Sequence, residues 1–344
     1  VEPLGLSVEI LTGQLKTSER KETLKALSDG TATLIVGTHA LIQEGVDFRD
    51  LGLVVVDEQH RFGVRQRMAL GEREIAPDTL IMSATPIPRS LAMTLYGDLD
   101  LSVLDEMPEG RKPVKTLLRY PSKRDEVYRL VDAELEAGRQ AYIVYPLVEE
   151  SEKVDLRAAT EEYERLSSEA FQNRRVGLIH GQLSSTEKDQ VMRAFLAGDL
   201  DVLVATTVIE VGIDVPNASV MVVEHAERFG LSQLHQLRGR VGRGAAKSYC
   251  ILIAEPGEVA AERLKVFRDT SDGFAVARAD LRIRGQGDLF GAQQHGRDPI
   301  LRFADLTKDE GLLTEAQTRA RALVETDPDL SGDGVTRIRE LMDH

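Results

Sequence analysis

The stretch GQLSSTEKDQVMRAFLAGDLDVLVATTVIEVGIDVPNASVMVVEHA, residues 181–226, decides the fold because the chain also contains a second, related version of it. Its counterpart is GQLKTSERKETLKALSDGTATLIVGTHALIQEGVDFRDLGLVVVDE, residues 13–58, and the two align after a one-residue adjustment before Gly45 and Gly212. Each copy predicts a helix that stops at a glycine, a β-branched strand ending in threonine, and a second apolar strand ending in acid. This repeat predicts two related α/β domains with largely parallel sheets and functional residues at the carboxyl ends of the strands.

The two copies differ in what precedes them. Before the second copy, the run QAYIVYPLV predicts a further strand, and helical segments alternate with strands as far as SYCILIA. Before the first copy, only Val1 to Leu6 precede VEILTG, so we expect a truncated first domain. The predicted division is a partial first domain (1–110), a second domain (111–262) and a carboxyl-terminal region (263–344).

Composition is that of a globular protein, with 42% of the 344 residues apolar and 29% charged. No stretch approaches the roughly 20 apolar residues of a membrane span, and no signal peptide opens the chain. The single cysteine, Cys250, lies in a strand-like run and is expected to be a small buried residue. With no disulfide possible within the chain, we expect a cytoplasmic location.

The net charge of −14 argues at first against nucleic-acid binding. Acid concentrates in VEESEKVDLRAATEEYERLSSE, which resembles a solvated helical face, whereas one short segment contains Arg238, Arg240, Arg243 and Lys247. The seven histidines are scattered, and none falls in a metal-binding pattern, so we infer no metal site built by the protein alone.

Paired carboxylates, Asp57 and Glu58, end an apolar run of the first copy. In nucleotide hydrolases, an Asp at such a strand end holds Mg²⁺ through water, and the Glu orients and deprotonates the attacking water. This strand needs a phosphate-binding loop as its partner, yet G-x-x-x-x-G-K-[ST] is absent from the chain. We therefore expect that loop upstream of Val1.

Two further motifs suit a nucleotide cleft. Ser83-Ala84-Thr85 ends another strand, and its hydroxyls suit a hydrogen-bonded link between nucleotide and nucleic-acid sites, although a polar strand end is an alternative. The glycines of QLHQLRGRVGRG would let Arg240 and Arg243 lie close to a neighbouring domain. Two arginines aimed across a cleft are what a transferring γ-phosphate needs, and a plain basic helix is the alternative.

These motifs, in this order over duplicated domains, resemble superfamily 2 helicases of the DEAD/DEAH type. Longer strings, among them VVVDEQHRFGVRQR, SATPIPRSLAMTLYGDLDLSVLDEMPEGR and DLRIRGQGDLFGAQQHG, are similar to the RecG family of bacterial ATP-dependent DNA helicases from about Leu4 onward. The resemblance implies two tandem RecA-like domains, the first truncated, followed by a helical hairpin region. It implies ATP and Mg²⁺ as cofactors. It also implies a monomer that translocates on double-stranded DNA and remodels stalled forks and Holliday junctions in repair and recombination.

The resemblance also assigns roles to residues. Asp57 and Glu58 take the acid roles given above, and Arg240 and Arg243 become arginine fingers. Gln236 lies near them, and nucleotide sensing falls to Gly212 and Asp214. The residues implied in DNA contact or in coupling DNA to nucleotide are Gly37, Thr38, His39, His60, Ser83, Ala84, Thr85, Thr206 and Thr207. The segment from about Arg268 to Gly296 is similar to the family's translocation motif, with coupling roles for Arg282, Arg284 and Gln294.

The sequence departs from the family pattern in lacking the phosphate loop and the amino-terminal wedge domain, and in having Gln293 where an Arg usually precedes Gln294. One alternative is the translocase of the transcription-repair coupling factor, which shares HRFG and SATPIPR. That protein typically has DEEH for the DEQH here and Glu-Thr-Gly for the segment 210–212. The other alternative is a non-hydrolysing DNA-binding module. The missing loop favours it, and the intact acids and arginines oppose it.

Overall fold

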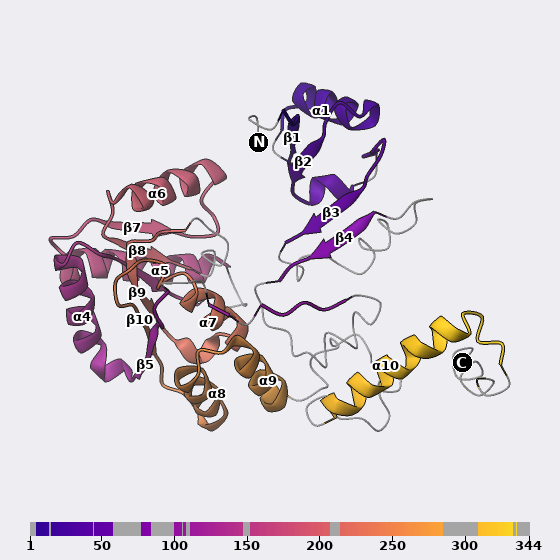
Figure 1. The fold of residues 1–344 in the computed structure, drawn as a ribbon. Coiled ribbons are helices and arrows are strands. Elements are labelled where there is room, and N and C mark those ends of the chain that lie inside the picture. Colours follow the sequence, from indigo (N-terminus) through magenta and orange to yellow (C-terminus); the bar gives the residue numbers. More distant parts are fainter. Residues whose placement is uncertain are drawn as a thin grey trace. The chain divides into compact units, whose positions relative to one another are not determined.

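The computed structural model of the chain describes residues 5–13, 15–43, 45–57, 77–83, 100–104, 106–107, 111–146, 152–206, 214–284, 309–332 and 335. The chain divides into two compact units, Val1–Ala84 and Thr85–His344 (Figure 1). Each unit is described by itself.

The described part of the first unit contains a helix and two-stranded parallel sheets. Its elements are β1 (Val8–Leu11), α1 (Thr17–Asp29), β2 (Leu34–Gly37), a 3-10 turn (His39–Ile42), β3 (Leu53–Val56) and β4 (Asp78–Ile81). β1 pairs with β2, and β3 pairs with β4. A small core gathers the buried side chains of Leu11, Leu27, Ala40 and Val46.

The second unit is built on a six-stranded sheet in the order β5-β10-β9-β6-β8-β7, and every neighbouring pair is parallel. The strands are β5 (Lys115–Arg119), β6 (Gln140–Val144), β7 (Val176–Ile179), β8 (Val202–Ala205), β9 (Ala218–Val223) and β10 (Tyr249–Ile253). The helices are α4 (Arg124–Glu136), α5 (Glu152–Arg165), α6 (Ser185–Ala197), α7 (Leu231–Arg238), α8 (Glu258–Asp269), α9 (Gly273–Arg284) and α10 (Glu310–Thr326). Shorter turns are Pro121–Lys123, the π-helical Leu166–Ala170, and Ala226–Arg228.

Helices cover both faces of the six-stranded sheet (Figure 1). Tyr142 and Val144 of β6 point to one face, where the core includes side chains of α6, α7, α8 and α9. Ala141 and Ile143 point to the other, where it includes side chains of α4, with α5 packed alongside. Successive strand residues alternate between faces. Because both faces are covered, the inner strands of the sheet are mostly apolar.

The structure shows the predicted repeat residue by residue. α1 and α6 have the same length, and each ends at a left-handed glycine, Gly30 with φ 78° and Gly198 with φ 80°. A left-handed residue at this position has no Cβ clash when it is glycine, which is why the same stop signal appears in both copies. The predicted α/β class, with parallel sheets in both units and helices after the second sheet, is confirmed.

Two features of the fold were not predicted. β5 forms the edge of the large sheet beside β10, although its sequence KTLLR carries two charges. The acidic run forms α5 and the π-helical turn, but part of its charge faces inward, as described below. Cys250 is buried as predicted, and burial raises the pKa of its thiol to about 12. Within the described ranges, no helix has the length and apolarity needed to cross a membrane.

Candidate functional site

The acidic edge of the first unit lies where β3 and β4 end. These strands are parallel with Val56 opposite Ile81, so Asp57 and Ser83 leave the sheet at the same edge. Both side chains are exposed. An exposed carboxylate at a strand end can hold a hydrated metal ion, which is the role predicted for Asp57. The other predicted residues of this edge, Glu58, His60, Ala84 and Thr85, lie outside the described residues.

A second polar edge lies where β2 ends. A Cβ on Gly37 would lie 2.2 Å from the carbonyl oxygen of Leu11, so only glycine fits beside the neighbouring strand. The backbone N–H of Thr38 donates to the same oxygen at 3.2 Å. The side chains of Thr38 and His39 are exposed at this edge. Both side chains are therefore accessible to solvent.

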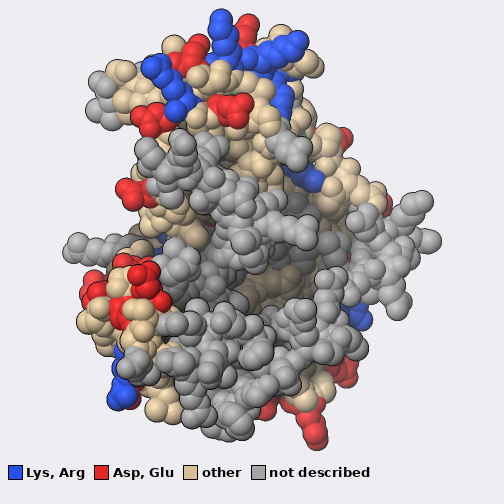
Figure 2. Space-filling model, turned by 90° about the vertical axis from the view of Figure 1, so that its right-hand side faces the viewer, with Lys and Arg blue, Asp and Glu red and all other residues tan. Residues whose placement is uncertain are grey.

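Four basic side chains gather on α1 and its amino-terminal cap, although the net charge is −14 and the same helix carries Glu19, Glu22 and Asp29. Figure 2 shows Lys and Arg side chains gathered over α1. The basic residues of this helix and its amino-terminal cap are Lys16, Arg20, Lys21 and Lys25. Because phosphate binding depends on the local field within about 10 Å at moderate ionic strength, the net charge does not exclude nucleic acid.

The corresponding edge of the second unit lies where β7 and β8 end. Thr206 follows β8, and its N–H donates to the carbonyl oxygen of Ile179 at 3.2 Å, as Thr38 does in the first unit. The Thr206 side chain is only 1% exposed. Thr207, predicted beside it, lies outside the described residues. The two copies thus place a threonine at the same backbone position with opposite exposure.

His180 lies opposite Thr206 at the end of β7 and was not among the predicted site residues. Among the described residues, neither its Nδ1 nor the Thr206 hydroxyl has a hydrogen-bond partner, although both atoms are buried. Burial, followed by the charge of Lys188, lowers the pKa of His180, so the ring is neutral at pH 7. The sequence signal for His180 was its place in the repeat, directly before Gly181.

The arginine loop, residues 239–247, follows α7 in the second unit. Arg243 Nη1 lies 3.4 Å from Asp214 Oδ1, and Arg243 Nε donates to the carbonyl oxygen of Gly239 at 3.0 Å. Two residues that the sequence assigned to nucleotide handling are therefore in contact. Such an ion pair orients the arginine side chain, and another anion can compete with the aspartate for the guanidinium.

Arg240 lies on the same loop and is half-buried. Burial raises the pKa of Tyr142 to about 12, and the charge of Arg240 opposes this shift. Asp214 also acts on the Tyr142 ring, so both residues lie near β6. Gln236 is half-buried on the last turn of α7. Gly212, the remaining predicted nucleotide-sensing residue, lies outside the described residues.

The glycines of the arginine loop permit close packing within the second unit. Gly242 has φ +79°, and a Cβ on it would lie 2.6 Å from Val114 Cγ2. A Cβ on Gly244 would lie 2.4 Å from the carbonyl oxygen of Pro216. The sequence interpretation attributed these glycines to approach by a neighbouring domain, whereas the described contacts are to the loop's own unit.

Arg238 differs from the other arginines of its segment because it is only 5% exposed. Its Nη1 donates to the carbonyl oxygens of Phe267 at 3.0 Å and Thr270 at 2.8 Å, and its guanidinium lies 4.1 Å from the Phe267 ring centroid. These contacts tie α7 to the end of α8. Arg238 is therefore a structural residue and adds nothing to a basic surface.

The helices after the large sheet form a hairpin. α8 and α9 are joined by residues 270–272, and Asp272 Oδ1 accepts from the N–H of Phe274 at 2.8 Å. Both helices pack against α7, which carries the arginine loop. Arg282 is exposed on α9, and its Nη2 lies 3.5 Å from Glu262 Oε1 of α8. The side chain of Arg284, together with Gln293 and Gln294, lies outside the described residues.

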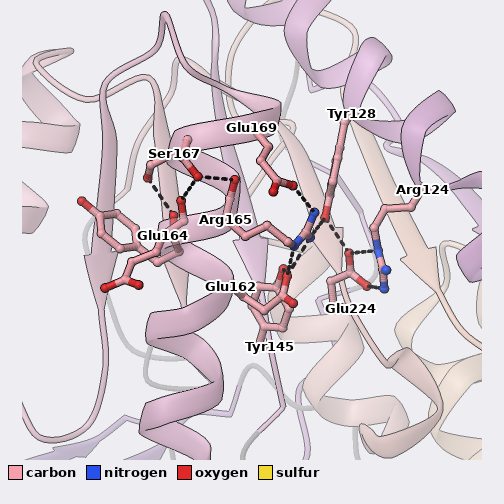
Figure 3. Close-up of polar contacts among 11 residues, drawn as sticks. Arg124, Tyr128, Tyr145, Glu162, Glu164, Arg165, Ser167, Glu169 and Glu224 are labelled. Carbon is pink, nitrogen blue, oxygen red and sulfur yellow. Dashed lines mark hydrogen bonds and ion pairs between the residues drawn. The ribbon is translucent and has the colours of Figure 1, made fainter.

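Glu224 occupies the position in the second copy that Asp57 occupies in the first, and it is fully buried. Arg124 Nε donates to Oε1 of Glu224 at 3.0 Å and Arg124 Nη2 donates to Oε2 at 2.9 Å (Figure 3). The hydroxyl of Tyr128 donates to Oε1 at 3.0 Å. A buried carboxylate needs a charge partner and several donors, and both come from α4.

The network extends from α4 to α5 (Figure 3). Arg165 Nη2 donates to the Tyr128 hydroxyl at 3.4 Å and to Glu162 Oε2 at 2.7 Å. The Tyr145 hydroxyl donates to the same Glu162 oxygen at 3.1 Å. Burial, followed by the charge of Glu224, raises the pKa of Tyr128. The acidic edge of the second copy is thus closed by α4 and α5, which precede the copy in the chain, and Glu224 is not open to a metal ion.

No group of three or more His, Cys, Asp or Glu side chains within the described residues could hold a metal ion. A Mg²⁺ ion bound with a nucleotide keeps several waters and takes few protein ligands, since the phosphates supply others. Asp57 is exposed, whereas Glu224 is buried and accepts hydrogen bonds from Arg124.

Three protein families match the chain in succession. The family "DEAD/DEAH box helicase" matches residues 1–94, and "Helicase conserved C-terminal domain" matches residues 122–245. The family "ATP-dependent DNA helicase RecG, domain 3, C-terminal" matches residues 270–336. The second match contains residues 239–245 of the arginine loop, and the third contains all of α9 and α10.

Curated relatives are similar along almost the whole chain. The ATP-dependent DNA helicase RecG of Synechocystis is 50% identical over 337 residues, which cover 98% of this chain and 40% of the relative. RecG of Thermotoga maritima is 53% identical over 314 residues, or 91% of this chain and 40% of that protein. The chain spans between 40% and 49% of the length of such relatives.

A solved structure has the same fold and a similar sequence. A structure titled "Structure of RecG bound to three-way DNA junction" matches with a TM-score of 0.66 and 50% identity. The match covers 90% of this chain and 40% of that chain.

Proposed function

Because the chain belongs to the RecG family of bacterial ATP-dependent DNA helicases, we propose that the complete protein is an ATP-driven motor on branched double-stranded DNA. Its products would be remodelled replication forks and Holliday junctions in repair and recombination. We further propose that it works as a monomer in the cytoplasm. The chain would form the motor part of this protein, and its amino-terminal wedge and phosphate loop would come from the remaining length seen in the relatives.

The contact between Arg243 and Asp214 carries this proposal. It brings a positively charged side chain on a glycine-rich loop to a half-exposed position beside an acid, at 3.4 Å. An arginine supplied from a second domain stabilises the charge that develops on a transferred γ-phosphate. Arg243 can exchange the Asp214 carboxylate for phosphate oxygens because both are anionic acceptors.

The proposed chemistry divides between the two units. ATP would supply the phosphoryl group, and Mg²⁺ would neutralise part of its negative charge. Asp57 would hold the hydrated metal, Glu58 would orient and deprotonate the attacking water, and Arg240 with Arg243 would stabilise the transition state. The hydroxyls of Ser83 and Thr85 would link this cleft to the DNA side.

The DNA side would use the ends of the inner strands. Thr38 and His39 are exposed at the end of β2, and they suit contact with the phosphate backbone. Thr206 offers a buried hydroxyl without a partner among the described residues, at the same backbone position in the second unit. Backbone contacts of this kind hold DNA without reading its sequence, as a translocating motor requires.

The two alternatives make different demands. A transcription-repair coupling translocase shares several motifs, but the relatives reported above are RecG proteins at about half identity along the chain. A non-hydrolysing DNA-binding module would have no use for an arginine loop fixed beside Asp214. For these reasons the RecG activity is the one we propose.

The test uses the complete protein that contains this chain. We expect ATP hydrolysis stimulated by a synthetic three-way junction, and unwinding of that junction, while the isolated chain hydrolyses no ATP because it lacks a phosphate loop. DNA binding without hydrolysis by the complete protein would support the non-hydrolysing alternative. Hydrolysis by the isolated chain, abolished by Glu58→Gln, would contradict the predicted need for an upstream loop.

A further inference from the structure

A short segment, residues 111–114, runs beside the arginine loop. The reason is topological: β5 and β10 are parallel neighbours with Lys115 opposite Tyr249. The N–H of Lys115 donates to the carbonyl oxygen of Ser248 at 2.9 Å. Because parallel neighbours start at the same edge, the residues before β5 lie against the residues before β10. The second group is the end of the arginine loop.

Two side chains of this segment hold the two ends of the loop. Lys112 Nζ donates to the carbonyl oxygen of Ala245 at 2.7 Å. Arg111 Nη2 donates to the carbonyl oxygen of Gly239 at 3.4 Å. Both acceptors are backbone atoms, so the contacts constrain the path of the loop and do not depend on its side chains.

The middle of the loop packs closely against residues 112–114 at Gly242. Gly242 has a left-handed φ of +79°, and a Cβ at this position would lie 2.6 Å from Val114 Cγ2 and 3.7 Å from the carbonyl oxygen of Lys112. Val114 is itself packed against the core of the second unit. The segment therefore meets the loop at Gly239, Gly242 and Ala245.

Arg111 is directly connected to a proposed arginine finger. The Gly239 oxygen that accepts from Arg111 also accepts from Arg243 Nε at 3.0 Å. Gly239 is the carboxyl-terminal cap of α7, where the helix dipole favours a cation. Arg111 and Arg243 thus share one carbonyl group, and displacement of Arg111 changes the acceptor that orients Arg243.

We infer that Arg111, Lys112 and Val114 are positioning residues that set the placement of Arg240 and Arg243. Residues 111–114 directly precede β5, and they contact the arginine loop at that point of the chain. This inference rests on the proposed function of the arginines.

The experiment compares variants of the complete protein by two measurements. The first is amide hydrogen exchange of residues 239–247 without nucleotide. The second is junction-stimulated ATP turnover as kcat and KM. The test variant is Arg111→Ala with Lys112→Ala. Its matched control is Lys115→Ala with Arg129→Ala, which removes the same charges from exposed positions that do not hold the loop.

We expect faster exchange in the arginine loop of the test variant and unchanged exchange in β9 and β10. We expect kcat to fall on the order of 10- to 100-fold with little change in KM, because a small misplacement of a catalytic group affects the transition state. The control should match the unmodified protein. Arg111→Lys should recover part of kcat because it keeps a cation at the helix terminus. In a protein that already carries Arg240→Ala and Arg243→Ala, the test variant should cause no further loss.

Other outcomes separate this inference from the proposed function. If Arg240→Ala abolishes turnover while the test variant keeps normal kcat and normal loop exchange, the inference is wrong and the proposed function stands. If Arg240→Ala and Arg243→Ala both keep full turnover, the arginine role fails, and the inference fails with it. Faster exchange throughout the sheet together with a lower unfolding temperature would show a general loss of stability and would also overturn the inference.

Discussion

The two copies of the repeat, residues 13–58 and 181–226, have corresponding helices and strands in their described parts, but they differ in which side chains are buried. At equivalent strand ends, Asp57 is exposed, whereas Glu224 is 0% exposed and is held by Arg124 and Tyr128. Both residues directly follow a strand with parallel pairing, β3 for Asp57 and β9 for Glu224. The difference comes from α4, which lies outside the copy and brings a guanidinium to the second acid.

A second contrast concerns the faces of the strands. Leu34 and Val36 of the first copy are 42% and 57% exposed, whereas the equivalent Val202 and Val204 are fully buried. In the second unit this face lies under α4 and α5. No corresponding helix covers it among the residues described for the first unit. An apolar strand pattern therefore indicates which side chains can be buried, and whether they are buried depends on the helices that pack on that face.

The largest expected effect concerns Arg240 and Arg243, which follow the second copy. In the complete protein, Arg240→Ala or Arg243→Ala should slow ATP turnover by ~10³-fold or more, because each removes positive charge from the transition state. Arg193→Ala, an exposed arginine of α6, is the matched control and should leave turnover unchanged. Steady-state hydrolysis with a three-way junction measures the effect. A variant with full turnover would identify the arginine as a structural residue.

The next effect tests the two copies at one equivalent position. Glu58→Gln should lower turnover by ~10²- to 10⁴-fold through loss of the general base, with nucleotide and DNA binding retained. The equivalent residue of the second copy is His225, which has φ 50°. His225→Asn keeps a residue that tolerates this backbone conformation and should leave turnover intact. Equal losses in both variants would remove the functional distinction between the copies.

The third effect is on stability. Glu224→Gln should lower the free energy of unfolding of the second unit by about 3 kcal/mol, because it leaves Arg124 without its anion in a largely buried site. Asp57→Asn should change the free energy of unfolding by less than about 0.5 kcal/mol, since the residue is exposed. Urea unfolding followed by circular dichroism measures both. Adding Arg124→Met to Glu224→Gln should restore part of the loss, and additive losses would contradict the pairing.

The smallest effect depends on pH and concerns α7, which follows only the second copy among the described residues. Burial, followed by the charge of Arg238, lowers the pKa of His235 to about 4. In the unfolded chain the value is near 6.5, so the unfolded state takes up a proton first as the pH falls. The contribution of the neutral His235 ring to the free energy of unfolding is therefore complete above pH 6.5. It is lost between pH 6.5 and 4, on the order of 2 to 3 kcal/mol.

Arg238 Nη2 lies 3.2 Å from His235 Nδ1, so the neutral ring accepts a hydrogen bond that the protonated ring cannot accept. His235→Gln should therefore flatten the fall in unfolding free energy between pH 7 and 4. Urea midpoints across that range provide the measurement. An unchanged pH slope in the variant would assign the acid sensitivity to other groups.

Sequence reasoning identified most elements of the second sheet and the strand ends that carry Asp57, Thr38 and Thr206. These were accessible because glycine stops, apolar runs and threonines are local signals. Arg238 was grouped with a basic cluster, because nothing local distinguishes an arginine that packs on Phe267 from one that faces solvent. His180 was missed because the burial of its ring nitrogen, which has no hydrogen-bond partner among the described residues, depends on the neighbouring strand.

The sequence by itself determined that this protein has two copies of one α/β unit, where the helix of each copy ends, and which strand ends carry acids and threonines. These properties follow from backbone preferences and apolar periodicity within a few residues. Only the tertiary structure decided that Arg124 closes Glu224, that Arg243 pairs with Asp214, and that residues 111–114 hold the arginine loop. Those outcomes join segments as far as 133 positions apart. They depend on which strands become neighbours in the sheet, and no local pattern contains that information.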